Sequence, residues 1–172
     1  MADVLGWLAR RRVTLGFVAA MVAIVFSRPT WPSWRAGLVV ALLGEAIRVW
    51  AAGHLEKSRE VTSSGPYRWT RHPLYLGSSF IAAGAVIAAN SVTVGAVTAI
   101  YMFATISAAV RTEEAHLRAA FGDAYDEYST SSGTPMHRSF SVERAMRNRE
   151  YRAVAGLCGG FALLALKLTA LI

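Results

Sequence analysis

Long apolar segments alternate with short polar connectors along this chain. The apolar segments are 13–26, 37–53, 74–89, 91–110 and 153–172. A helix that crosses the hydrocarbon core of a bilayer needs about 20 residues, with about 17 as the lower limit. The segments 13–26 and 74–89 are short by this measure and would recruit flanking residues. The pattern predicts an all-α integral membrane protein that forms a single membrane domain, residues 1–172, with about five transmembrane helices.

A tight helical hairpin is predicted at the junction of the third and fourth segments, because Asn90 alone separates them. Two helices joined by so short a turn run antiparallel. His72 lies 18 residues before Asn90 and Glu113 lies 23 residues after it. At a rise of about 1.5 Å per residue, both helical arms are long enough to bring these two residues to the same membrane face.

Basic residues are unevenly distributed between the connectors. The chain is 54% hydrophobic and 17% charged, with a net charge of +7, and fourteen of its 18 lysines and arginines fall on one side if the N-terminus is cytoplasmic. The positive-inside rule therefore predicts a cytoplasmic N-terminus, cytoplasmic connectors at 54–73 and 111–152, and a C-terminus on the opposite side. Cations placed beside membrane segments favour contact with the lipid bilayer, and we expect no nucleic-acid partner.

Two polar motifs flank the predicted hairpin. GPYRWTRHPLYLG precedes the third segment, and RTEEAHLRAAFGDAYDEY follows the fourth. Arg71 can pair with a carboxylate through two parallel hydrogen bonds, while Glu113 and Glu114 can accept hydrogen bonds. The alternative is a purely structural role, in which Arg71 and His72 anchor a helix at the membrane interface and Glu113 and Glu114 face solvent. Glutamates at a helix C-terminus oppose its dipole, however, which favours a binding site.

Together these motifs resemble the paired signatures of the isoprenylcysteine carboxyl methyltransferase and phospholipid methyltransferase superfamily. The upstream segment GEAIRVWAAGHLEKSREV is similar to the one that precedes them there, so the resemblance covers residues 44–128. It implies an integral membrane enzyme that binds S-adenosyl-L-methionine in a pocket closed by the hairpin and its connectors. The residues it implies for cofactor binding are Tyr67, Arg71, His72, Tyr75, Gly77, Glu113, Glu114, Tyr125 and Tyr128.

The expected reaction is methyl transfer to a lipophilic acceptor at the cytoplasmic face, with Arg71, Glu113 and Glu114 as catalytic candidates. The acceptor would be an isoprenylcysteine carboxylate or another lipid carboxylate or thiol. N-methylation of phosphatidylethanolamine, nicotinamide-dependent lipid reduction and a non-enzymatic membrane role are the alternatives. The acceptor stays open because the chain departs from the family pattern after Tyr128, continuing as STSSGTPMHRSF. His54 and His116 have no ligand spacing, so no metal site is expected.

Three ionisable residues lie within the predicted spans. Glu45 and Arg48 are three positions apart and share a helix face, so we expect them to pair within the membrane. They are either substrate-binding residues or an ion pair that joins helices. Lys167 lies near the outer end of the last span, and we expect its side chain to extend to the interface.

Small residues predict where the helices approach one another. Gly77 and Gly84 lie in the third segment, and Gly156, Gly159 and Gly160 lie in the fifth. Glycines in membrane helices allow close contact between backbones. No strand is expected before these glycines, so a phosphate-binding role is not favoured.

Overall fold

The computed structural model describes residues 16, 18–57, 59–130 and 136–170. These residues form helices and loops, and no strand occurs among them. The predicted span 13–26 lies partly outside the described residues, and its described part is helical over 18–26. The last two residues of the predicted span 153–172 also lie outside them.

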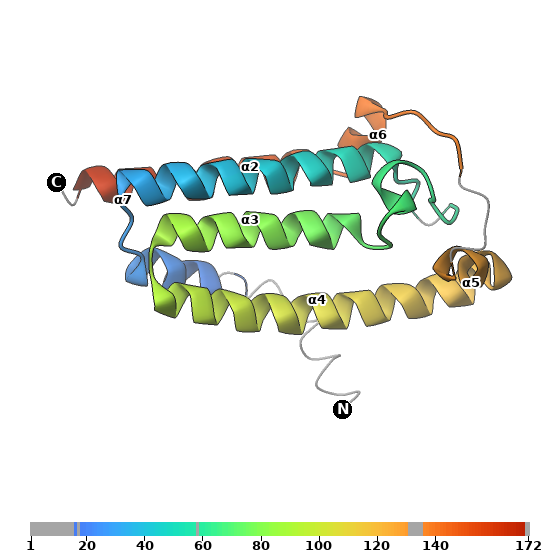
Figure 1. Ribbon diagram of the computed structural model, residues 1–172, viewed down its shortest axis with the longest axis horizontal. Helices are drawn as coiled ribbons and strands as arrows, with labels where there is room; N and C mark the ends of the chain where they lie inside the picture. The colour runs from blue at the N-terminus through green and yellow to red at the C-terminus, as the bar shows by residue number, and fades with distance from the viewer. Residues whose placement is uncertain (1–15, 17, 58, 131–135, 171–172) are drawn as a thin grey trace.

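Four long helices run along the molecule (Figure 1). They are α2 (Trp31–His54), α3 (Pro73–Ala89), α4 (Val92–Phe121) and α7 (Tyr151–Ala170). Helix α3 packs against α2, α4 and α7. Helices α2, α4 and α7 are long and apolar enough to cross a membrane, and α3 is a shorter apolar helix. The predicted all-α membrane fold is confirmed.

Two of these helices extend beyond the predicted spans for local reasons. Helix α2 begins at Trp31 and not at Gly37, because the Thr30 side chain accepts a hydrogen bond from the Ser33 backbone and the Ser33 side chain accepts one from the Thr30 backbone. Helix α4 continues past residue 110, where its apolar segment ends, through a run of good helix formers. It ends at Gly122, whose φ of 48° suits glycine.

The helical hairpin is present where the sequence predicts it. Asn90 ends α3 in a left-handed conformation, with φ 48° and ψ 48°. The Ser91 side chain then accepts a hydrogen bond from the Val94 backbone and begins α4. Asparagine tolerates the left-handed region, and serine is a favoured N-cap, so the two residues reverse the chain within a single turn.

Glycines bring α2 and α3 into backbone contact. A Cβ atom added to Gly77 would lie 2.6 Å from the carbonyl oxygen of Gly44, and one added to Gly84 would lie 2.5 Å from that of Gly37. The packing role predicted for Gly77 and Gly84 therefore holds. The same prediction is wrong for Gly156, Gly159 and Gly160, since no described atom lies within 4 Å of a Cβ placed there.

Short elements gather at one end of the bundle. They are η1 (Gly65–Arg68), α5 (Asp123–Ser129) and α6 (Val142–Arg147). The Asn148 side chain donates to the carbonyl oxygens of Ala52 and Leu55, both at 2.9 Å, and Arg144 Nε donates to that of Gly53 at 2.8 Å. These bonds satisfy carbonyl groups that a helix end leaves free, and so dock the α6 segment onto the end of α2.

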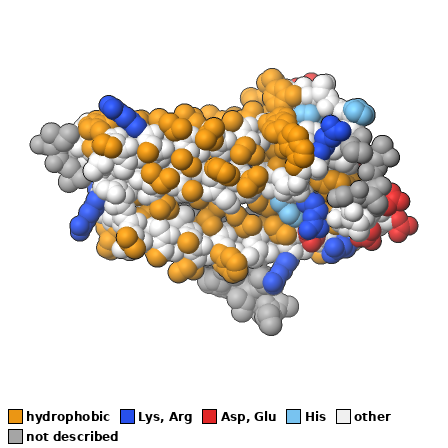
Figure 2. Space-filling view, viewed as in Figure 1, with side chains coloured by type: hydrophobic (Ala, Val, Ile, Leu, Met, Phe, Trp, Pro, Cys, Tyr) orange, Lys and Arg blue, Asp and Glu red, His pale blue; other side chains and the backbone are white. Residues whose placement is uncertain are grey.

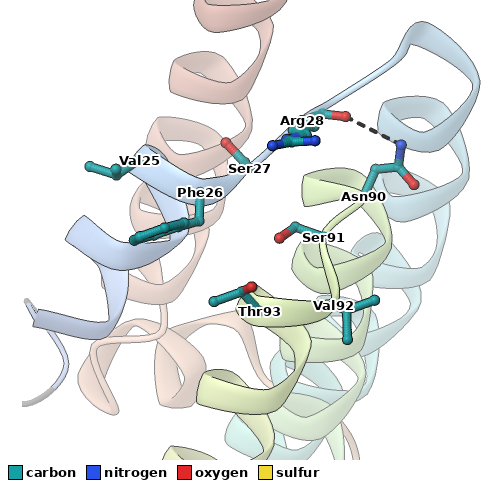
Figure 3. Close-up of a pocket in the computed structure, with 8 residues that line it drawn as sticks. All are labelled: Val25, Phe26, Ser27, Arg28, Asn90, Ser91, Val92 and Thr93. Atoms are coloured by element: carbon teal, nitrogen blue, oxygen red, sulfur yellow. Dashed lines mark hydrogen bonds between the residues drawn. The ribbon is translucent and has the colours of Figure 1, made fainter.

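Charged side chains concentrate at the end of the molecule that carries these short elements, and the middle of the visible face is mainly hydrophobic (Figure 2). At the opposite end, the hairpin contacts the segment before α2. The Arg28 backbone donates to the carbonyl oxygen of Ala89 at 2.7 Å, and the Asn90 side chain donates to that of Arg28 at 3.3 Å. A cavity of about 400 Å³ lies between residues 25–28 and 90–93 (Figure 3).

Lys167 ties α7 to the helix that precedes α2. Its Nζ donates to the carbonyl oxygens of Ile24 at 2.6 Å, Val25 at 3.0 Å and Ser27 at 2.7 Å. These carbonyl groups lie at the hairpin end of the bundle, and the extension of this side chain to the interface stays a prediction. A cation is favoured where the carbonyl groups of a helix end converge, and here that helix belongs to another part of the chain.

Candidate functional site

A cavity of about 340 Å³ lies at the charged end of the bundle, between the start of α3, the end of α4, α5 and the loop that follows α2. Most of the residues singled out from the sequence line it. They are Arg48, Tyr67, Arg71, His72, Tyr75, Glu113, Tyr125 and Tyr128. Glu45, Gly77 and Glu114 are not among the lining residues, and Gly77 faces α2 instead.

Local sequence places the first motif, GPYRWTRHPLYLG, at the N-terminus of α3. Pro73 occupies the first turn of α3, where its missing N–H group costs nothing, and His72 is the residue before it. The preceding turn η1 is held by Tyr128, whose hydroxyl donates to the Tyr67 carbonyl oxygen at 2.9 Å. This bond joins the two motifs across the cavity.

Glu114 connects the two neighbouring basic residues of the first motif. Its Oε1 lies 3.2 Å from His72 Nε2 and 3.3 Å from Arg71 Nη1. A carboxylate only accepts hydrogen bonds, so the contact with His72 requires that Nε2 carries the proton. Glu114 thereby fixes both the ring orientation of His72 and the direction of the Arg71 side chain.

Glu113 is placed differently from Glu114. Its Oε2 lies 4.0 Å from His72 Nδ1, which is too long for a hydrogen bond, and 44% of its side chain is exposed. Only 19% of the Glu114 side chain is exposed. Glu113 therefore faces the cavity, while Glu114 does not line it and contacts Arg71 and His72 instead.

Two buried polar atoms at the cavity have neither a hydrogen bond nor a close ion pair among the described residues, whereas the buried Glu60 Oε1 is paired with Arg138. The two atoms are His72 Nδ1 and the Tyr125 hydroxyl oxygen. Unsatisfied buried polar groups are uncommon in folded proteins, and a bound ligand is one way to satisfy them. Burial raises the pKa of Tyr125, and it raises that of Tyr128 to about 12, so both hydroxyls remain protonated donors near neutral pH.

Arg48 pairs with a residue that sequence reasoning missed. Its Nε donates to Glu150 Oε1 at 2.6 Å, and its Nη1 donates to Ser78 Oγ at 2.5 Å. Glu45 makes no such contact, and both of its carboxylate oxygens are buried without a hydrogen-bond partner among the described residues. The predicted pairing of Glu45 with Arg48 is therefore wrong.

The position of Glu150 explains this error. It is 102 residues from Arg48, and the chain brings the two together only because α6 docks on the end of α2 and α7 then runs back along it. The one signal in the sequence is an acidic residue within the basic stretch RNREYR, immediately before the last apolar segment. Spacing along a single helix could not reveal such a partner.

Comparison with known proteins places most of the bundle within one family. The sequence profile described as phospholipid methyltransferase matches residues 33–124, a range that contains α3, α4 and most of α2. No solved structure matches the chain. Within the part of the chain that the structure describes, no three or more His, Cys, Asp or Glu side chains cluster as metal ligands.

Two curated relatives are bacterial proteins named for metal resistance. The cobalt-zinc-cadmium resistance protein CzcN of Cupriavidus metallidurans is 32% identical over 127 residues, which cover 69% of this chain and 57% of the relative. The nickel-cobalt-cadmium resistance protein NccN of Alcaligenes xylosoxydans xylosoxydans is 30% identical over 135 residues, which cover 72% of this chain and 63% of the relative. The chain thus spans less than two thirds of the length of either relative.

Proposed function

Because the chain belongs to the phospholipid methyltransferase family, we propose that it transfers a methyl group from S-adenosyl-L-methionine to a lipophilic acceptor. The observation that carries the proposal is the cavity of about 340 Å³, which is lined by cations, carboxylates and hydroxyl and ring atoms without hydrogen-bond partners among the described residues. We place this cavity on the cytoplasmic side, since fourteen of the 18 lysines and arginines belong to segments on that side.

The lining residues suit the polar groups of this methyl donor. Arg71 would hold its carboxylate, and His72 and Tyr125 would supply further hydrogen bonds through the atoms that lack partners. Glu113 would accept from its ammonium group or its ribose hydroxyls. S-adenosyl-L-methionine supplies an activated methyl group, whose bond to sulfur breaks with the electron pair left on sulfur as an acceptor oxygen bonds to the carbon.

The protein would contribute to catalysis mainly by aligning the donor with the acceptor and by excluding water. Glu114 holds Arg71 and His72 in one arrangement, and the bond from Tyr128 to the Tyr67 carbonyl group joins the two motifs at the cavity wall. Correct positioning of two reactants can lower a barrier by about 7–11 kcal/mol. A carboxylate acceptor needs no base, because the product is a neutral ester and no proton is released.

Donor binding by the protein in lipid nanodiscs tests the proposal. We expect Arg71→Gln to weaken the affinity for S-adenosyl-L-methionine about 10- to 100-fold, the effect of losing a charge-assisted hydrogen bond. Arg68→Gln is the matched control, since Arg68 is exposed in the same connector and does not line the cavity. Equal affinities for the two variants, or no binding by the wild type, would contradict the assignment.

Phosphatidylethanolamine is the second candidate acceptor, because the family description names phospholipids. Methylation of its amine releases a proton. Glu56 and Glu60 also line the cavity but pair with Arg147 and Arg138, so Glu113 is the carboxylate that could take the proton. Incubation with methyl-labelled donor and total membrane lipid separates the two candidates. Label in alkali-labile esters supports a carboxylate acceptor, and label in phospholipid head groups supports the amine.

A further inference from the structure

A second cavity, of about 540 Å³, lies within the apolar part of the bundle. Side chains from α3, α4, α7 and the helix before α2 line it, and nearly all of them are small or apolar. Arg48 and Ser78 line this cavity and also the polar cavity described above. The two cavities therefore meet at these two side chains.

The guanidinium group of Arg48 is held in place at this junction. Nε is bound to Glu150 and Nη1 to Ser78, whereas Nη2 makes no hydrogen bond to any described residue. Only 20% of the Arg48 side chain is exposed. A fixed guanidinium group with a free N–H edge is suited to bind a planar acid, and here an apolar cavity begins beside it.

We propose that the apolar cavity holds the tail of the acceptor and that Arg48 binds its head group through Nη2. The acceptor is then a long-chain carboxylic acid, a class that the proposed function, on which this inference rests, leaves open. Methylation would remove the charge that Arg48 binds, so the ester product would be held less tightly than the acid.

Helix α7 lies outside the family match at 33–124, so this part of the chain would set acceptor choice.

Three glycines of α7 provide a built-in comparison. Gly156 and Gly160 line the apolar cavity and Gly159 does not, although a Cβ atom at any of the three would have no described atom within 4 Å. Leucine can therefore be introduced at each position at similar steric cost. Gly156 lies about 9 Å and Gly160 about 15 Å along the helix from Glu150, so the two positions probe different depths from the head group.

Binding of labelled fatty acids in nanodiscs, without any methyl donor, tests the tail site. We expect Gly160→Leu to weaken hexadecanoic acid binding about 10- to 50-fold, the effect of excluding a few methylene groups, and to spare octanoic acid. Gly156→Leu should weaken both acids, and Gly159→Leu neither. Equal effects of Gly159→Leu and Gly160→Leu, or none at Gly156 and Gly160, would overturn the proposal.

The head-group site is tested by comparing hexadecanoic acid with its methyl ester. The wild type should prefer the acid about tenfold or more, and Arg48→Gln should lose this preference. Because Arg48→Gln leaves Glu150 buried without its partner, the double variant Arg48→Gln/Glu150→Gln is measured beside it. A preference for the acid that persists in both variants refutes the role of Arg48.

Donor affinity, measured in the same samples, keeps this inference separate from the proposed function. Unchanged binding of S-adenosyl-L-methionine by the leucine variants shows that only the tail site was altered. Acid binding without donor binding by the wild type would remove the methyltransferase proposal and leave the acid site standing. Donor binding without acid binding would remove the acid site and leave the methyltransferase proposal standing.

Discussion

The contact between α2 and α3 leads to a quantitative prediction for Gly77→Ala. The new Cβ would lie 2.6 Å from the Gly44 carbonyl oxygen and 2.5 Å from Arg48 Cγ. Ordinary contacts between heavy atoms begin near 3.5 Å, so the helices must separate locally by about 1 Å. Overpacking of this kind costs about 1–3 kcal/mol. Alanine also stabilises a helix by up to about 1 kcal/mol relative to glycine, which partly offsets this loss of stability.

Gly159→Ala is the control that removes the propensity contribution. It introduces the same methyl group in a membrane helix, where no described atom lies within 4 Å. The difference in the free energy of unfolding between the two variants, measured in bicelles, should therefore be about 1–3 kcal/mol. Gly84→Ala should match Gly77→Ala, because its Cβ would meet the Gly37 carbonyl oxygen at 2.5 Å. If Gly77→Ala proved as stable as Gly159→Ala, the close α2–α3 contact would be wrong.

Three further substitutions test single contacts. Lys167→Met should lower the free energy of unfolding by about 1–3 kcal/mol, because Nζ donates to three carbonyl oxygens at the end of the preceding helix, and Lys167→Arg should recover part of that loss. Tyr128→Phe should cost about 0.5–1.5 kcal/mol. Since the pKa of Tyr128 is raised to about 12, wild-type stability should fall as the pH rises from about 10 to 12, and the variant should lack this contribution. Glu114→Gln should weaken donor affinity about 5- to 10-fold while Glu114→Asp recovers part of it, and wild-type affinity in Glu114→Gln would exclude a positioning role.

The features that were predictable from the sequence depend on local signals or on simple lengths. Asn90 and Ser91 are turn and cap residues between two apolar segments, so the hairpin followed from their chemistry. The lengths of its two arms then placed His72 and the paired glutamates at the same end. The different positions of Glu113 and Glu114 could not be predicted from the sequence. Adjacent residues on a helix point in different directions, and only packing decides which one faces the cavity.

The features that escaped prediction depend on how distant segments dock. A pairing of Glu45 with Arg48 satisfies the geometry of an isolated helix, yet the Arg48 side chain reaches across to Ser78 of α3 and to Glu150 before α7. The glycines of α7 show the same limit. Their spacing suggests a contact surface, but in the fold two of them border a cavity.

The buried pair of Arg48 and Glu150 constrains how an acid can bind at the junction of the cavities. The Glu150 side chain is only 7% exposed. Glu45 lies close enough to interact electrostatically with Glu150 and Arg48, and its own carboxylate is buried without a hydrogen-bond partner among the described residues. An acid that displaced Glu150 would leave a second buried carboxylate without a partner, and breaking a buried pair in this way costs about 3–5 kcal/mol. The remaining Nη2 edge of Arg48 avoids that cost. Acid binding should therefore leave the Arg48–Glu150 contact intact, and Glu150→Gln should preserve the preference for acid over ester.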